Sequence, residues 1–123
     1  MKKLIVILLI FCAQLQAQEG NDSIVIVKNY LSEIKQTVLS KKSKKAKILK
    51  MQQLIRVGID QREIFERNIR RTKSHEQAEE LIRSFNLILQ SAILYKNDLA
   101  ETNADSEVIY LKNNIPKLLK ELD

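Results

Sequence analysis

Few side chains in this sequence are of the types that carry out chemistry, and their spacing is not that of a catalytic or metal site. His75 is the single histidine, whereas metal sites in proteins usually draw on several His or Cys ligands. The serine before it does not make a catalytic pair, because a triad is defined by spatial geometry and needs oxyanion donors. Glu76, Glu79 and Glu80 would need opposing ligands from another helix to hold a cation. A solvated helix face with a Glu79–Arg83 ion pair is the simpler interpretation. We therefore expect no enzymatic activity, no catalytic residue, no metal and no cofactor.

A lysine-rich tract is the most pronounced charge feature of the chain. Residues 76–107, by contrast, hold seven acidic residues and only two basic ones. Such a tract could contact anionic lipid headgroups or an acidic partner, and a solvated lysine-rich loop is the alternative. We expect peripheral membrane contact or protein contact rather than nucleic-acid binding. The candidate residues for contact with an anionic surface are Lys41, Lys42, Lys44, Lys45 and Lys47.

The first seventeen residues have the three-part layout of a secretory signal peptide. Two lysines are followed by an apolar run from Leu4 to Phe11, and then by a small residue, Ala17. The run is well short of the roughly 20 apolar residues of a membrane-spanning helix. A lipoprotein signal would acylate Cys12, but Phe11 stands where such signals have a small residue. We predict a periplasmic or secreted protein, cleaved after Ala17.

Cleavage after Ala17 would leave 106 residues with a formal charge of +4 and no cysteine. A chain of this length forms one small domain with a modest core, held together here by packing rather than by disulfides. Two glycines and one proline are too few for the turns of a β-rich domain. We predict a signal peptide over 1–17, a polar lead over 18–22, and a single all-α helical bundle of about five helices over 23–123.

The apolar periodicity predicts helices over 24–40, 44–57, 61–71, 75–101 and from about 105 onward. The last of these is expected to kink or break at Pro116, with Asn114 capping a final short helix. The helix over 75–101 carries the longest apolar stripe of the chain. Its members are Ala78, Leu81, Ile82, Phe85, Ile88, Leu89, Ala92, Ile93, Tyr95 and Leu99.

Local signals mark where these helices begin and end. Ser23 or Asp22 can cap the first helix and Ser43 the second, and Ser74 with Gln77 forms a capping box for the fourth. Two further signals predict the junction near residue 60. Gly58 is placed to end the second helix in a left-handed conformation. The third helix is expected to begin with a capping box of Asp60 and Glu63, flanked by a hydrophobic staple of Ile59 and Ile64.

The middle of the chain resembles the helical half of the periplasmic phospholipid carriers of the MlaC (toluene-tolerance) family. The resemblance covers about residues 25–97 and lies in Asp60 with Arg62, and in Ser74 with Glu76 and Gln77. It implies a carrier of lipid with a cavity between helices and a curved sheet. The chain departs from the family in offering helix where those strands come, and in lacking the Gly and Trp before the second motif.

The sequence is compatible with two functions, and both are non-enzymatic. The first is an accessory or carrier protein for lipid or another hydrophobic ligand, as the resemblance implies. The second is a structural or protein-interaction module of the cell envelope, with an exposed apolar helix face and no small-molecule ligand. The sequence leaves the oligomeric state undetermined. The candidate ligand-binding residues are Ile64, Phe65, Phe85, Leu89 and Ile93.

Overall fold

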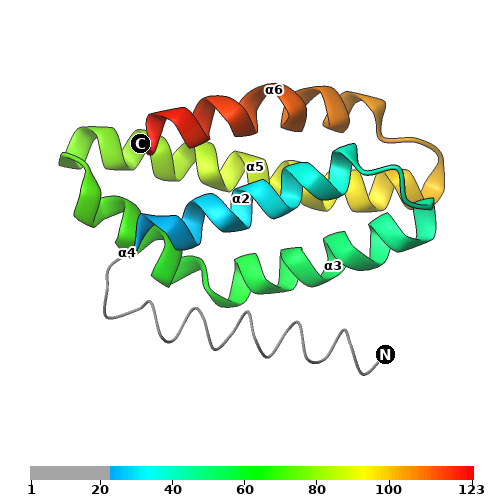
Figure 1. Cartoon of the computed structure of the whole chain (residues 1–123), viewed down its shortest axis with the longest axis horizontal. Helices are drawn as coiled ribbons and strands as arrows, with labels where there is room; N and C mark the ends of the chain where they lie inside the picture. Colours follow the sequence, from blue (N-terminus) through cyan, green and yellow to red (C-terminus); the bar gives the residue numbers. More distant parts are fainter. Residues whose placement is uncertain (1–22) are drawn as a thin grey trace.

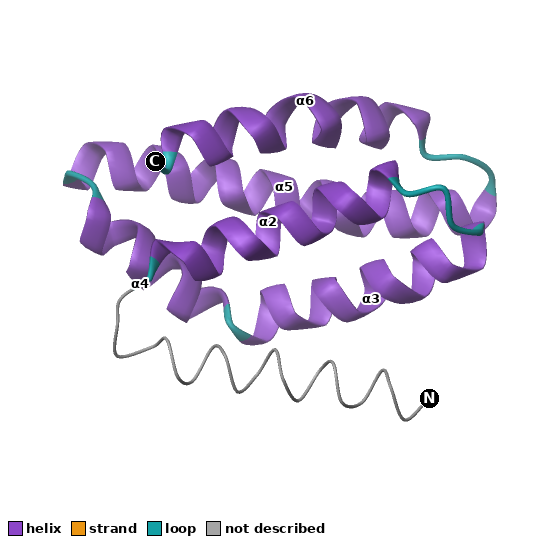
Figure 2. Cartoon of the chain, in the orientation of Figure 1, coloured by secondary structure: helices purple, strands orange, loops and turns teal. Residues whose placement is uncertain are grey.

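The computed structural model describes residues 23–123, and these form an all-α bundle without strands (Figures 1 and 2). The predicted all-α fold with about five helices is therefore confirmed for this part of the chain. The predicted signal peptide, its cleavage after Ala17, the lipoprotein alternative at Cys12 and the polar lead 18–22 lie outside the described residues. The helices are α2 (Ile24–Leu39), α3 (Lys44–Asp60), α4 (Arg62–Thr72), α5 (His75–Glu101) and α6 (Asp105–Glu121).

The four long helices form the bundle, and the shorter α4 connects two of them. Helix α2 packs against α3 and α6, and α5 packs against the same two helices, so α2 and α5 lie diagonally opposite. Neighbouring helices run antiparallel, as Figure 1 shows. Helix α4 continues from α3 and contacts both α2 and α5. Within the described residues, no helix is long and apolar enough to cross a membrane.

Serine caps begin three of the helices. The sequence predicts Ser43 and Ser74, and of the two alternatives for the first helix, Ser23 and Asp22, the structure has Ser23. The side-chain oxygen of Ser23 accepts a hydrogen bond from the Val25 amide at 3.2 Å, and Ser43 accepts one from Ala46 at 3.2 Å. Ser74 accepts a bond from the Gln77 amide at 3.4 Å. Each bond satisfies one of the amides that a helix start leaves without an intrahelical partner. These local contacts fix the starts of α2, α3 and α5.

The junction between α3 and α4 differs from the prediction. Asp60 is the last residue of α3, and Gln61 precedes α4 without a side-chain cap. The expected capping box of Asp60 and Glu63 is therefore wrong. Ile59 remains 58% exposed, which does not fit the expected staple with Ile64. Helix α3 instead continues past its predicted end at residue 57 to Asp60, so that Gly58 lies within the helix and is buried.

Gly58 lies inside α3 rather than at its end, so its predicted role as a left-handed C-terminal residue is wrong. A Cβ atom at this position would overlap the hydroxyl oxygen of Tyr30 and would lie 2.9 Å from Cδ1 of Leu89. The Tyr30 hydroxyl donates a hydrogen bond to the Leu54 carbonyl at 2.5 Å, one turn earlier in α3. Glycine is thus required by the close approach of a tyrosine from α2.

Helix α6 runs without a break from Asp105 to Glu121, with Pro116 inside it. The predicted restart of the helix after a break is therefore wrong. The ring removes one amide donor, and the carbonyl left without it belongs to Lys112, which is exposed to water like Pro116. Asn114 does not cap a new helix, because its side-chain amide donates to the Tyr110 carbonyl at 2.8 Å.

Three aromatic rings form the centre of the core. Tyr30 of α2 stacks on Phe65 of α4 with ring centroids 4.9 Å apart, and Phe85 of α5 lies 5.9 Å from Tyr30 and 5.5 Å from Phe65. All three side chains are buried. Because they come from three helices, this cluster fixes the position of α4 relative to the bundle.

Candidate functional site

The five residues predicted to bind a hydrophobic ligand occupy two environments. Phe65, Phe85 and Leu89 are buried in the core, while Ile64 and Ile93 are half-buried at its edge. The structure brings Phe65 and Phe85 together in the aromatic cluster, and places Leu89 beside the contact between α3 and α2. Side chains of the protein itself therefore surround the predicted ligand positions.

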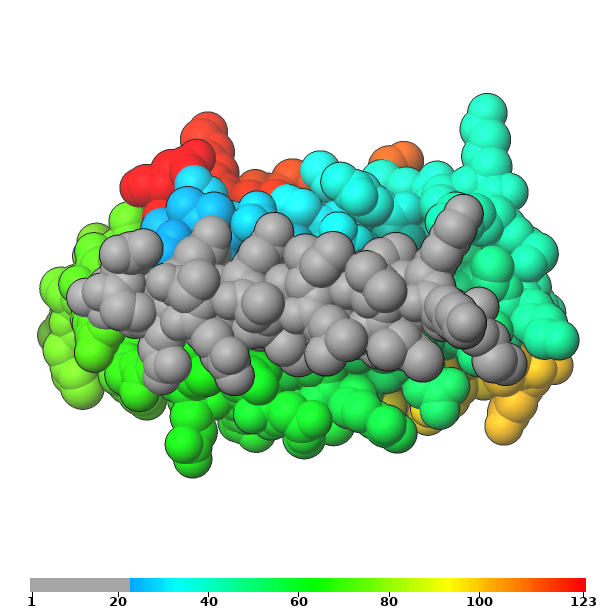
Figure 3. All heavy atoms as spheres, turned by 60° about the horizontal axis from the view of Figure 1, so that its bottom comes forward, coloured from blue at the N-terminus to red at the C-terminus, as the bar shows by residue number. Residues whose placement is uncertain are grey.

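The predicted basic surface lies at one end of the bundle. Lys41, Lys42, Lys44 and Lys45 are exposed, and Lys47 is half-buried. In Figure 3 the connection between α2 and α3 stands beside the end of α5. The following hydrogen bonds tie this region to its surroundings. The Lys44 ammonium donates to the Thr102 carbonyl at 2.9 Å, and that of Lys47 donates to the Val38 carbonyl at 3.4 Å.

The hydrogen bond between Lys44 and Thr102 brings the lysines close to a group of acidic residues. The connection between α5 and α6 lies at the same end as the lysines, and it is flanked by acidic residues. Charges that are separated along the sequence are thus neighbours in the fold, which reduces the positive potential that the lysines present to a distant anionic surface. The acidic residues around this connection are Asp98, Glu101, Asp105 and Glu107.

Two of these acidic side chains meet across α5 and α6. The pKa of Glu107 is raised above its ordinary value, chiefly by a hydrogen bond with the Asp98 side chain and further by the negative charges of Asp98 and Asp105. Within residues 23–123, no group of three His, Cys, Asp or Glu side chains could hold a metal ion. The pair is therefore a point of like-charge repulsion at the surface that a cation from outside would relieve.

Helix α5 also carries two leucines that point away from the core. Leu87 is 46% exposed and Leu94 is 52% exposed, and they lie seven residues apart. At 100° per residue, this spacing places them on the same side of the helix. We call their surroundings the α5 outer face. It consists of Arg83, Leu87, Gln90, Ser91, Leu94 and Asp98.

The predicted apolar stripe of α5 leaves out Leu87 and Leu94. The signal that could have found them is nevertheless present in the sequence, because their helical angles lie opposite those of the stripe. Leucine at an outward position is ordinary when it is isolated. Two leucines one heptad apart on one face instead suggest a contact surface.

Shallow clefts lie on both sides of Leu87. One, of about 280 Å³, lies between α5 and α6, where Ser84 and Leu87 face Tyr110, Asn114 and Lys117. The other, of about 320 Å³, runs along α5. The residues that line the second cleft are Glu79, Ile82, Arg83, Asn86, Leu87 and Gln90. Leu87 is thus a ridge between two hollows, a shape into which side chains of another helix could pack.

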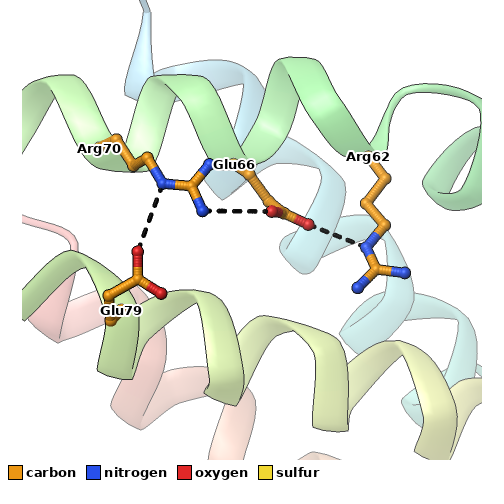
Figure 4. Close-up of polar contacts among 4 residues, drawn as sticks. All are labelled: Arg62, Glu66, Arg70 and Glu79. Atoms are coloured by element: carbon orange, nitrogen blue, oxygen red, sulfur yellow. Dashed lines mark hydrogen bonds and ion pairs between the residues drawn. The ribbon is translucent and has the colours of Figure 1, made fainter.

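A chain of charges fastens α4 to α5 (Figure 4). Glu66 lies between Arg62, at 2.8 Å, and Arg70, at 3.7 Å, and the Arg70 guanidinium also reaches Glu79 of α5 at 3.4 Å. Glu79 thus pairs with an arginine of another helix, whereas the sequence suggested Arg83 of its own helix. The four side chains satisfy one another, so we interpret them as structural.

No protein-family model, curated protein or solved structure matches this chain. The α5 outer face is the strongest candidate, because it combines exposed apolar side chains, clefts and both signs of charge.

Proposed function

We propose that this protein is an exported, non-enzymatic helical module that acts by binding another protein through the α5 outer face. The observation that carries the proposal is the outward placement of Leu87 and Leu94, one heptad apart and each about half exposed. Apolar side chains grouped on one helix face are typical of helix-docking surfaces. The signal-peptide pattern of residues 1–17 supports export.

The alternative, a carrier of lipid or another hydrophobic ligand, has less support. An internal ligand would have to displace the cluster of Tyr30, Phe65 and Phe85, whose rings fill the space among α2, α4 and α5. Losing that packing would remove several kcal/mol of stability, since truncating one buried aromatic side chain alone costs about 3–5 kcal/mol. The lysines that would steer an anionic headgroup also share their end of the bundle with acidic residues.

Photo-crosslinking tests the proposal. A photoreactive amino acid would replace Leu87 in the protein expressed in its own host, and a second variant would carry it at Leu49. Leu49 is a matched control, because it is an exposed leucine on another helix, with 51% of its surface accessible. We expect one discrete crosslinked protein from position 87 that position 49 does not give. Identical products from the two positions would overturn the proposal.

Extraction of the purified protein with organic solvent, followed by mass spectrometry, tests the carrier alternative. We expect no stoichiometric lipid. A lipid recovered at about one molecule per chain, and lost on Phe85→Ala, would favour the carrier and contradict the interaction module.

A further inference from the structure

We propose that the partner of the α5 outer face is a second copy of this chain, bound antiparallel about a two-fold axis that passes between Gln90 and Ser91. This inference rests on the proposed function, because it uses the same surface and commits to its occupant. A two-fold interface requires a self-complementary surface, in which residue i meets residue j of the other copy and j meets i.

The α5 outer face has this self-complementarity in its sequence. Residues at equal distances from the midpoint of 90 and 91 become opposite one another in an antiparallel pair. Leu87 is then opposite Leu94, and Gln90 is opposite Ser91. Further out, Arg83 is opposite Asp98, so the polar midpoint is flanked on each side by a leucine pair, and beyond each leucine pair lies a pair of opposite charges. The region from 83 to 98 spans about 22 Å of helix, enough for a contact of several turns.

The carboxyl pair of Asp98 and Glu107 fits this register. The two side chains lie close together where α5 meets α6, and the negative charges of Asp98 and Asp105 contribute to the raised pKa of Glu107. In the antiparallel register, Arg83 of the second copy lies opposite Asp98, where its guanidinium would neutralise the pair. A guanidinium suits this position, because its planar array of donors can bind two carboxylate oxygens at once.

The ridge at Leu87 also fits the shape that such a pair requires. A leucine from a second helix packs beside a ridge rather than on top of it, and the clefts on both sides of Leu87 offer that space. Two leucines per chain bury little area, and Glu80 lies opposite Glu101 at the ends of the register. We therefore expect a weak dimer, smaller than the roughly 1,200 Å² of a standard stable interface.

Analytical ultracentrifugation of the protein as the cell produces it tests the inference, from about 10 µM to about 1 mM. We expect a reversible equilibrium between monomer and dimer. Arg83→Asp and Asp98→Arg should each weaken the dimer at least about tenfold, since each places like charges opposite one another. The double variant R83D/D98R should restore the affinity to within about threefold of the original. Arg56→Asp, an exposed change on α3, is the matched control and should have no effect.

Three results would overturn self-association through α5. These are a monomer at every concentration, single reversals that leave the dimer intact, or a double variant that fails to recover while its helical circular dichroism is unchanged. The two proposals fail separately. A monomeric protein that still gives a discrete crosslink to a different protein from position 87 contradicts only self-association. A dimer insensitive to both reversals, with no specific crosslink from position 87, contradicts both.

Discussion

Gly58 and Tyr30 meet in a contact that leaves no room for one more carbon atom. Gly58→Ala should destabilise the protein by about 1–3 kcal/mol, because the overlap with the Tyr30 hydroxyl exceeds the gain of about 1 kcal/mol in helix propensity. Urea unfolding measures this change. Tyr30→Phe alone should cost about 1 kcal/mol, through loss of the hydrogen bond to the Leu54 carbonyl.

The double variant Gly58→Ala with Tyr30→Phe is the control for this contact. Removal of the hydroxyl opens space for the new methyl group, so the double variant should lose less stability than the sum of the two single changes. Additive losses would show that the two residues do not meet as described.

The Tyr30 hydroxyl also makes stability depend on alkaline pH. Burial raises the pKa of Tyr30 above its ordinary value, outweighing a favourable contact with the backbone at Gly58. The folded protein therefore keeps this proton while the unfolded chain loses it near its usual pKa of about 10. Stability should be fully present below pH 10 and fall as the pH rises further.

Urea midpoints measured from pH 8 to pH 11 check this dependence. The decline above pH 10 should be smaller in Tyr30→Phe than in the original protein. Part of the decline should persist in the variant, because burial also raises the pKa of Tyr95. Equal declines in the two proteins would rule out a role for Tyr30.

Helix α6 contains Pro116 in its interior and is nevertheless continuous. Pro116→Ala should stabilise the protein by about 2 kcal/mol, because alanine restores an amide donor for the Lys112 carbonyl and removes the clash of the ring. The gain is below the full helix-propensity difference, because proline also restricts the unfolded chain. Urea unfolding measures the change in the free energy of unfolding. The control is Asn113→Ala, an exposed position about one turn earlier, for which we expect a gain of about a few tenths of a kcal/mol. A loss of stability on Pro116→Ala would contradict this account.

The helices also show which features the sequence could predict. The caps Ser23, Ser43 and Ser74 depend on atoms within three residues, so local patterns predict Ser43 and Ser74 and limit the first cap to Ser23 or Asp22. The role of Gly58 depends on Tyr30, 28 positions earlier, which a local pattern cannot contain. Asp60 had a suitable partner in Glu63, but tertiary packing extended α3 through it. The apolar periodicity of the sequence was sufficient to predict the helices, whereas contacts between helices determine the junction near residue 60.

The candidate site shows the same division at the scale of the whole molecule. Apolar periodicity identified core residues such as Phe65 and Phe85, but it could not distinguish a filled core from a ligand cavity. The lysines at 41–47 were evident in the sequence. Their acidic neighbours at the ends of α5 and α6 became evident only when the chain folded, because more than 50 residues separate the two groups.

The export that the first seventeen residues predict would concern the whole molecule, and it would give the protein a defined mature N-terminus. We expect mass spectrometry of the exported protein to find a chain of 106 residues that begins at Gln18. Ala17→Phe should block cleavage, because signal peptidases require a small residue at that position. A chain that begins at an acylated Cys12 would contradict the prediction and favour the lipoprotein alternative.

The last residue of the chain is held against the beginning of the bundle. The carboxylate of Asp123 forms an ion pair with Lys28 of α2, and its backbone oxygen accepts a hydrogen bond from the Lys73 ammonium at 3.3 Å. Ser23 and Asp123 therefore lie at one end, and Lys41–Lys47 at the other, about 24 Å away along α2. A tether joined to this domain at either terminus would therefore attach at the same end of the bundle. The lysines would then lie at the end far from the tether, and the α5 outer face, on the side of the bundle, would remain accessible. A tether and a docking partner would thus occupy different parts of the surface.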